Sequence, residues 1–203
     1  MKRKISNRIF ISILVTFSMF HTAFAAENIN APTASAILIN SETGEKTSLD
    51  VKQINNVSKS AIGRSIVEYE VFAPISNPNT PALMDEKGDY ITEGGVTARA
   101  SVEYYISNDG EELQVEACSG SWEPSDPAVY YVTDREYSIT DDKNTARGNP
   151  TSNSFQRDLK WPYVQRNPIT SISGPRITTV ATAHVSGMEG THQLWLFFNF
   201  GNR

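Results

Sequence analysis

The run Val96-Thr97-Ala98-Arg99-Ala100-Ser101-Val102-Glu103-Tyr104-Tyr105-Ile106 alternates between two kinds of side chain. The even-numbered positions are all apolar or aromatic, whereas most odd-numbered positions are polar or charged. A period of two is typical of a half-buried strand, and a helix with this pattern would carry charge into its buried face. The run therefore predicts a long β-strand with one face in a core.

The sequence that follows predicts that this strand is half of a hairpin. Asn108-Asp109-Gly110 is a turn sequence that tolerates positive φ angles. Leu113, Val115 and Ala117 then resume the alternation. We expect the second strand to end before Trp122, which stands close to Pro124 and Pro127 in a turn-rich segment.

Similar patterns recur along the chain. Strands are predicted over 36–39, 65–72, 128–139, 177–186 and 192–200, while 47–54 fits either a hairpin partner or a helical turn. The last strand has Leu194 and Leu196 on one face but Trp195 and Phe197 on the other, so we expect it to lie between two layers. Together, these segments predict an all-β fold, an antiparallel β-sandwich of about eight or nine strands. A closed β-barrel is the alternative, although an outer-membrane barrel is disfavoured by charged and small residues on faces that would meet lipid.

The first 25 residues have the three parts of a secretory signal. A cationic head precedes the apolar stretch 9–20, and Ala23-Phe24-Ala25 supplies a cleavage pattern. The apolar stretch is short for a membrane span, so we expect cleavage, no integral membrane segment afterwards, and an extracellular or periplasmic location. Residues 26–203 are expected to form a single all-β domain, with a flexible lead-in over 26–35 and a long polar loop over 140–160.

Charge and cysteine content restrict the possible partners and stabilising devices. Four of the 18 basic side chains lie in the signal, so the mature chain would carry 14 basic and 23 acidic groups, a net charge of −9. This balance argues against nucleic acid and anionic lipid surfaces as partners. The one cysteine, Cys118, excludes a framework of disulfides within the chain, a composition typical of a secreted bacterial protein.

No pattern predicts a catalytic, metal or cofactor site. The chain has no Gly-x-Ser-x-Gly motif, and Cys118 has no activating neighbour in the sequence. His184 and His192 flank the last turn and Glu189 lies between them, but three possible ligands without a fixed register do not define a metal site. We therefore assign no catalytic residue, no metal ligand and no cofactor.

Aromatic side chains are the better candidates for a binding site. Exposed flat rings can stack on the faces of sugars, and tryptophans in Pro-containing turns are more exposed than those in strands. The alternative is that these rings cover the open ends of the sandwich. The candidate binding residues are Trp122, Tyr130, Trp161 and Tyr163.

These observations favour a secreted, non-enzymatic binding or surface-associated protein whose ligand is a glycan or another protein. One alternative is an exported hydrolase of extracellular polymers that uses paired carboxylates. Another is a secreted toxin or bacteriocin-like protein that acts on membranes.

Overall fold

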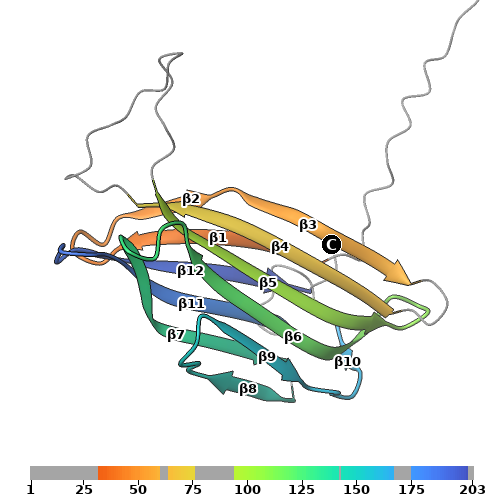
Figure 1. The fold of residues 1–203 in the computed structure, drawn as a ribbon. Coiled ribbons are helices and arrows are strands. Elements are labelled where there is room, and N and C mark those ends of the chain that lie inside the picture. The colour runs from red at the N-terminus through yellow and green to blue at the C-terminus, as the bar shows by residue number, and fades with distance from the viewer. Residues whose placement is uncertain (1–31, 60–63, 76–93, 142, 167–174, 201–203) are drawn as a thin grey trace, which may run out of the picture.

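The computed structural model describes residues 32–59, 64–75, 94–141, 143–166 and 175–200. Every regular element in these ranges is a strand, and the strands form two antiparallel sheets, seen as two layers in Figure 1. The prediction of an antiparallel β-sandwich is confirmed, but the described residues form twelve strands and not eight or nine. Both sheets are open, so the alternative of a closed barrel is wrong for the described residues.

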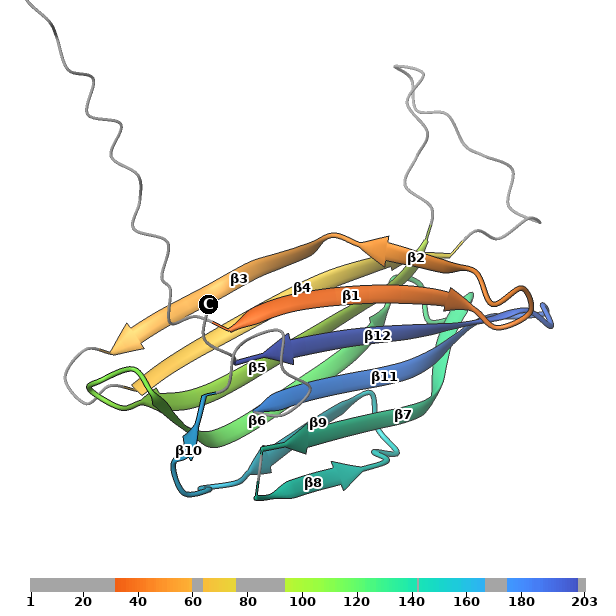
Figure 2. The same ribbon diagram turned by 180° about the vertical axis from the view of Figure 1, so that it is seen from behind.

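One sheet joins the first and the last strands of the described residues, and this sheet faces the viewer in Figure 2. The first long strand pairs with the last one, and the last hairpin continues the sheet toward the middle of the chain. Its order is β2 (Lys46–Leu49), β1 (Thr33–Asn40), β12 (Thr191–Asn199), β11 (Arg176–Val185), β7 (Tyr130–Thr140) and β8 (Thr145–Gly148).

The other sheet contains the strand with which the sequence analysis began. β5 (Gly95–Ile106) pairs with β6 (Glu112–Pro124) as the predicted hairpin, and a bulge follows Glu103. Two further strands, β9 (Ser154–Asp158) and β10 (Val164–Gln165), pair with different parts of β6. The main order is β10, β6 (Glu112–Pro124), β5 (Gly95–Ile106), β4 (Arg64–Pro74) and β3 (Val51–Lys59).

The core lies between the inner faces of the two sheets. Large rings connect the layers: Tyr69 of β4 meets Phe198 of β12 edge to face at 5.2 Å between ring centroids, and Tyr104 of β5 meets Phe200 at 5.5 Å. Edge-to-face contacts of this kind add to the free energy gained by burying the rings. The same core contains buried aliphatic side chains of both sheets, including Val67, Val102, Leu194 and Leu196.

The polar segment 140–160 contains two strands, so the prediction of one long loop is wrong. β8 pairs with β7 at the edge of one sheet, and β9 pairs with β6 in the other sheet. Both strands are short, and most of their side chains are exposed or half-exposed. The sequence therefore lacks the run of apolar residues by which a buried strand is recognised.

Other local predictions have mixed outcomes. The segment 47–54 is extended, so the helical turn is wrong, and the hairpin reading is confirmed only for its first part: β2 pairs back with β1, whereas β3 begins at Val51 and pairs with β4 in the other sheet. β1 begins at Thr33, within the predicted flexible lead-in 26–35. The signal segment 1–25 and residues 26–31 of the lead-in lie outside the described residues. Within the described part of the chain, no helix has the length and apolarity needed to cross a membrane.

The contact between Tyr69 and Phe198 gives a direct test of the core. We expect Phe198→Ala to lower the free energy of unfolding by about 3–5 kcal/mol, because it leaves a cavity between the sheets. Tyr163→Ala, at a side chain that is 40% exposed, should change it by less than about 0.5 kcal/mol. Urea denaturation followed by tryptophan fluorescence measures both, and equal effects of the two substitutions would contradict this packing.

Candidate functional site

Two of the four predicted binding residues are buried in the core. Trp122 is 1% exposed because β6 continues to Pro124 and turns this side chain inward, where its ring lies 5.8 Å from that of Phe155. Tyr130 is 6% exposed at the start of β7. The prediction that Trp122 sits in a turn is therefore wrong, and neither ring can stack on a ligand in this structure.

The other two predicted residues lie between β9 and β10. Trp161 is half-buried against the core, whereas Tyr163 is exposed. Neither ring stacks on another aromatic ring among the described residues. The four candidates therefore do not form a common platform.

A different set of rings lies on the outer face of the sheet shown in Figure 2. Tyr131 of β7 stacks on His184 of β11 with ring centroids 4.6 Å apart and planes 4° apart. Trp195 and Phe197 of β12 stack on each other at 5.8 Å with an angle of 20°. We call these four residues the ring face.

The strand register explains why the ring face points away from the core. Leu194, Leu196 and Phe198 alternate with Trp195 and Phe197 along β12 and are buried, so the two rings must lie on the other side. The prediction that β12 lies between two layers is therefore wrong: it is a central strand within its sheet, but only one of its faces meets the other sheet.

Uncharged side chains surround the Trp195–Phe197 pair. Val180 and Thr178 of β11 are directly opposite the two rings, and Ile37 and Ser35 of β1 flank them on the other side. Thr182 and Gln193 form the next pair along the sheet toward His184. The ring face thus combines flat apolar surface with neutral groups that can donate and accept hydrogen bonds.

A β-bulge shapes the end of the ring face that holds Tyr131. The register between β7 and β11 shifts between Val180 and Thr182, and the bulge places Asp134 at a φ of 46°. The hydroxyl of Thr133 donates to Oδ2 of Asp134 at 2.9 Å and lies 2.7 Å from Nε2 of His184. The Thr133 hydroxyl therefore joins the carboxylate of Asp134 to the imidazole of His184.

This cluster contains the residue types of nucleophilic catalysis but not their arrangement. In a catalytic triad the carboxylate binds the imidazole, which in turn takes a proton from the hydroxyl. Here the carboxylate of Asp134 accepts the hydroxyl proton of Thr133 directly. The geometry therefore orients polar groups for hydrogen bonding and does not activate Thr133 as a nucleophile.

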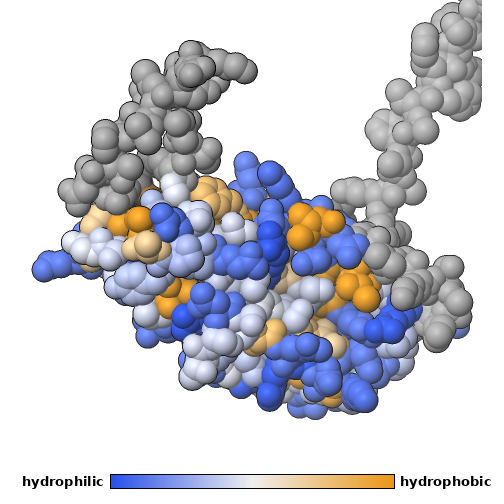
Figure 3. Space-filling model, in the orientation of Figure 1, coloured by the Kyte–Doolittle hydropathy of each residue, from blue (hydrophilic) through white to orange (hydrophobic). Residues whose placement is uncertain are grey.

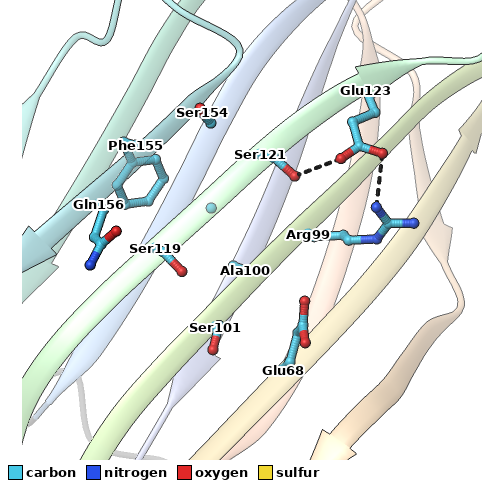
Figure 4. Close-up of a pocket in the computed structure, with 11 residues that line it drawn as sticks. Glu68, Arg99, Ala100, Ser101, Ser119, Ser121, Glu123, Ser154, Phe155 and Gln156 are labelled. Carbon is cyan, nitrogen blue, oxygen red and sulfur yellow. Dashed lines mark hydrogen bonds and ion pairs between the residues drawn. The ribbon is translucent and has the colours of Figure 1, made fainter.

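The outer face of the opposite sheet has a different character. Figure 3 shows that this side of the molecule is mostly hydrophilic. It is hollowed by about 520 Å³ over a row of serines, with Gln156 and Ser154 on one side and Glu68, Arg99 and Glu123 on the other (Figure 4). The guanidinium of Arg99 binds Glu70 at 2.7 Å and Glu123 at 2.8 Å, so both carboxylates already share one cation.

His184 and His192 do not form a shared site. His192 pairs with Ala183, one position away from the pair formed by His184 and Thr191, so the two imidazoles belong to opposite faces of the sheet. Burial lowers the pKa of His192, and the nearby charge of Glu42 offsets part of this effect. Among the residues that the structure describes, no group of three or more His, Cys, Asp or Glu side chains could hold a metal ion.

Trp195 and Phe197 were visible in the sequence as the second apolar face of a strand, and they were wrongly assigned to an interlayer contact. Tyr131 and His184 are harder to recognise from the sequence as members of a common surface. Their stacking depends on the pairing of β7 with β11, two strands separated by more than 30 residues. Pairing over this separation cannot be read from the local pattern of either strand.

Cys118 should be chemically inert in the folded protein. Its side chain is buried, and burial raises the pKa of the thiol from 9.0 to about 12. The thiolate, which is the reactive form, is therefore suppressed at pH 8. We expect no reaction with Ellman's reagent in buffer at pH 8 and one thiol per chain in 6 M guanidinium chloride, and rapid labelling of the native protein would contradict this burial.

Comparison with known proteins does not supply a relative from which a function could be transferred. No protein-family model, no curated protein and no solved structure matches the chain.

Proposed function

We propose that the protein is an exported, non-enzymatic carbohydrate-binding protein and that the ring face holds its ligand. The observation that carries this proposal is the presence of two stacked ring pairs, Tyr131–His184 and Trp195–Phe197, on the outer side of one sheet. Large aromatic side chains in an isolated β-sandwich are normally turned inward, as Tyr104 and Phe198 are here. Rings on an outer face therefore favour a role in recognition.

The chemistry of the ring face suits a sugar. The C–H bonds on one side of a pyranose carry slight positive charge and are attracted to the negative face of an aromatic ring. The hydroxyl groups at the rim of the same sugar need hydrogen-bond partners, and Thr178 and Gln193 lie beside the rings to supply them, the amide oxygen of Gln193 also accepting from Nε1 of Trp195 at 3.3 Å.

The spacing of the ring pairs favours an extended ligand over a single sugar. Trp195 lies four residues after the position on β12 that pairs with His184, a distance of about 14 Å along the strand. A monosaccharide can cover only one pair at a time. A polysaccharide chain lying along β12 can contact both, and the two contacts then reinforce each other.

The negative charge of the molecule disfavours acidic polysaccharides as ligands. The predicted mature chain has a net charge of −9, and Asp134 and Glu136 are exposed beside the bulge. Uronic acids, sulfated sugars and phosphate-bearing polymers would be repelled. We therefore favour neutral or amino-sugar polymers, which an exported protein would meet outside the cell.

The paired carboxylates of the opposite sheet favour binding over the hydrolase alternative. A glycoside hydrolase needs one carboxyl group as an acid and a second as a base or nucleophile. Glu70 and Glu123 both bind the guanidinium of Arg99, so the two carboxylates are engaged in one ion-paired group. This arrangement connects three neighbouring strands, and it does not leave the two carboxylates facing each other across an open cleft.

Removal of the rings tests the proposal. We expect Trp195→Ala combined with Phe197→Ala to weaken binding to insoluble cellulose or chitin by about tenfold or more, because a stacking surface worth about 1.4 kcal/mol or more is lost. Tyr131→Ala should weaken binding at the other end of the face. Co-sedimentation isotherms of the purified chain measure these effects.

Tyr163→Ala is the matched control, because it removes an exposed ring that lies outside the ring face. It should bind as the unchanged protein does, and thermal melting should show that all variants are folded. Unchanged binding by the Trp195 and Phe197 variant, or loss of binding in Tyr163→Ala alone, would refute the proposed site. Wild-type protein that binds neither polymer but does capture a protein ligand would favour the alternative partner.

A further inference from the structure

Asp134 occupies an unusual backbone conformation next to the ring face. It is one of two non-glycine residues with positive φ in the described part of the chain, the other being Lys160 at 48°. Side chains with a Cβ atom rarely adopt this region, although Asp and Asn tolerate it better than most. Such residues cluster at functional sites, where the surrounding structure holds them in place.

The surroundings of Asp134 fix the direction of its carboxylate. Its Oδ2 accepts the hydroxyl proton of Thr133 at 2.9 Å, and that hydroxyl oxygen lies 2.7 Å from Nε2 of His184. The imidazole of His184 stacks on the ring of Tyr131. A continuous series of contacts therefore leads from the exposed ring of Tyr131 to the carboxylate.

The carboxylate retains free capacity to accept hydrogen bonds. Asp134 is exposed and forms no ion pair with another described residue. The adjacent Arg135 does not neutralise it, because that guanidinium donates to Oδ1 of Asn153 and to the carbonyl of Val132. An ionised carboxyl group has about four acceptor positions, and Thr133 occupies one of them.

We propose that Asp134 contacts the ligand and accepts hydrogen bonds from sugar hydroxyl or amino groups while the sugar stacks on Tyr131. The bulge and the positive φ angle serve to place this carboxylate at the end of the ring face. The proposal rests on the carbohydrate-binding function inferred above and adds a specificity-determining residue to it. Its consequence is selectivity for sugars with free hydroxyl or amino groups over polymers that carry acidic groups.

The unusual backbone conformation provides a test that separates binding from stability. Asp134→Gly relieves the conformation and removes the carboxylate, so it should raise Tm slightly and weaken binding to insoluble cellulose or chitin by about tenfold. Lys160→Gly is the matched control, because Lys160 is also exposed and also has a positive φ angle. It should change Tm in the same direction and leave binding unchanged.

Two further measurements complete the test. Asp134→Asn keeps the side chain shape and a residue type that accepts positive φ, so a loss of binding in this folded variant would identify the negative charge as the important property. Polygalacturonate, an acidic polymer, should bind more weakly than cellulose or chitin to the unchanged protein, and Asp134→Asn should reduce this difference.

The outcomes distinguish this proposal from the general function. If Asp134→Gly and Asp134→Asn bind cellulose and chitin as the unchanged protein does, Asp134 has only a structural role and the proposal is overturned, while binding by the ring face still stands. If the unchanged protein binds none of the three polymers, both proposals fail.

Discussion

The packing of Tyr69 on Phe198 and of Tyr104 on Phe200 is the contact on which the rest of the structure depends. These rings hold the two sheets together, and they assign one face of β4, β5 and β12 to the core. Because side chains alternate across a strand, burial of the even-numbered residues of β12 forces Trp195 and Phe197 outward. The ring face is thus a geometric consequence of the core and depends on the same strand register.

The two outer surfaces of the sandwich differ in charge and in aromatic content. On the β4, β5 and β6 side, Arg99 connects Glu70 and Glu123 across three strands, and the surface is hydrophilic (Figure 3). On the other side, the central strands carry rings, threonines and aliphatic groups without a charge beside Trp195. A protein that required only solubility would not need this difference. We attribute it to a ligand that offers an apolar face and a polar rim.

Strong alternation allowed the long strands and the sandwich to be predicted, as the agreement of β5, β6 and β11 with the sequence shows. The edge strands β8 and β9 were missed because their polar side chains resemble those of a loop. Trp122 was placed in a turn because prolines follow it closely in the sequence. In the structure β6 continues as far as Pro124, and the side chain of Trp122 is buried in the core. The candidate site depends on the long-range pairing of β7 with β11 and on the bulge at Asp134, and neither is encoded in one local pattern.

The central claim is that Trp195, of the three tryptophans, contacts the ligand. Fluorine NMR of the protein labelled with 5-fluorotryptophan reports on all three side chains in one spectrum. We predict that a soluble oligosaccharide of cellulose or chitin shifts the Trp195 resonance, assigned by Trp195→Phe, and leaves that of the buried Trp122 unchanged. A saturable shift confined to Trp161, or saturable binding that moves no tryptophan resonance, would contradict the account.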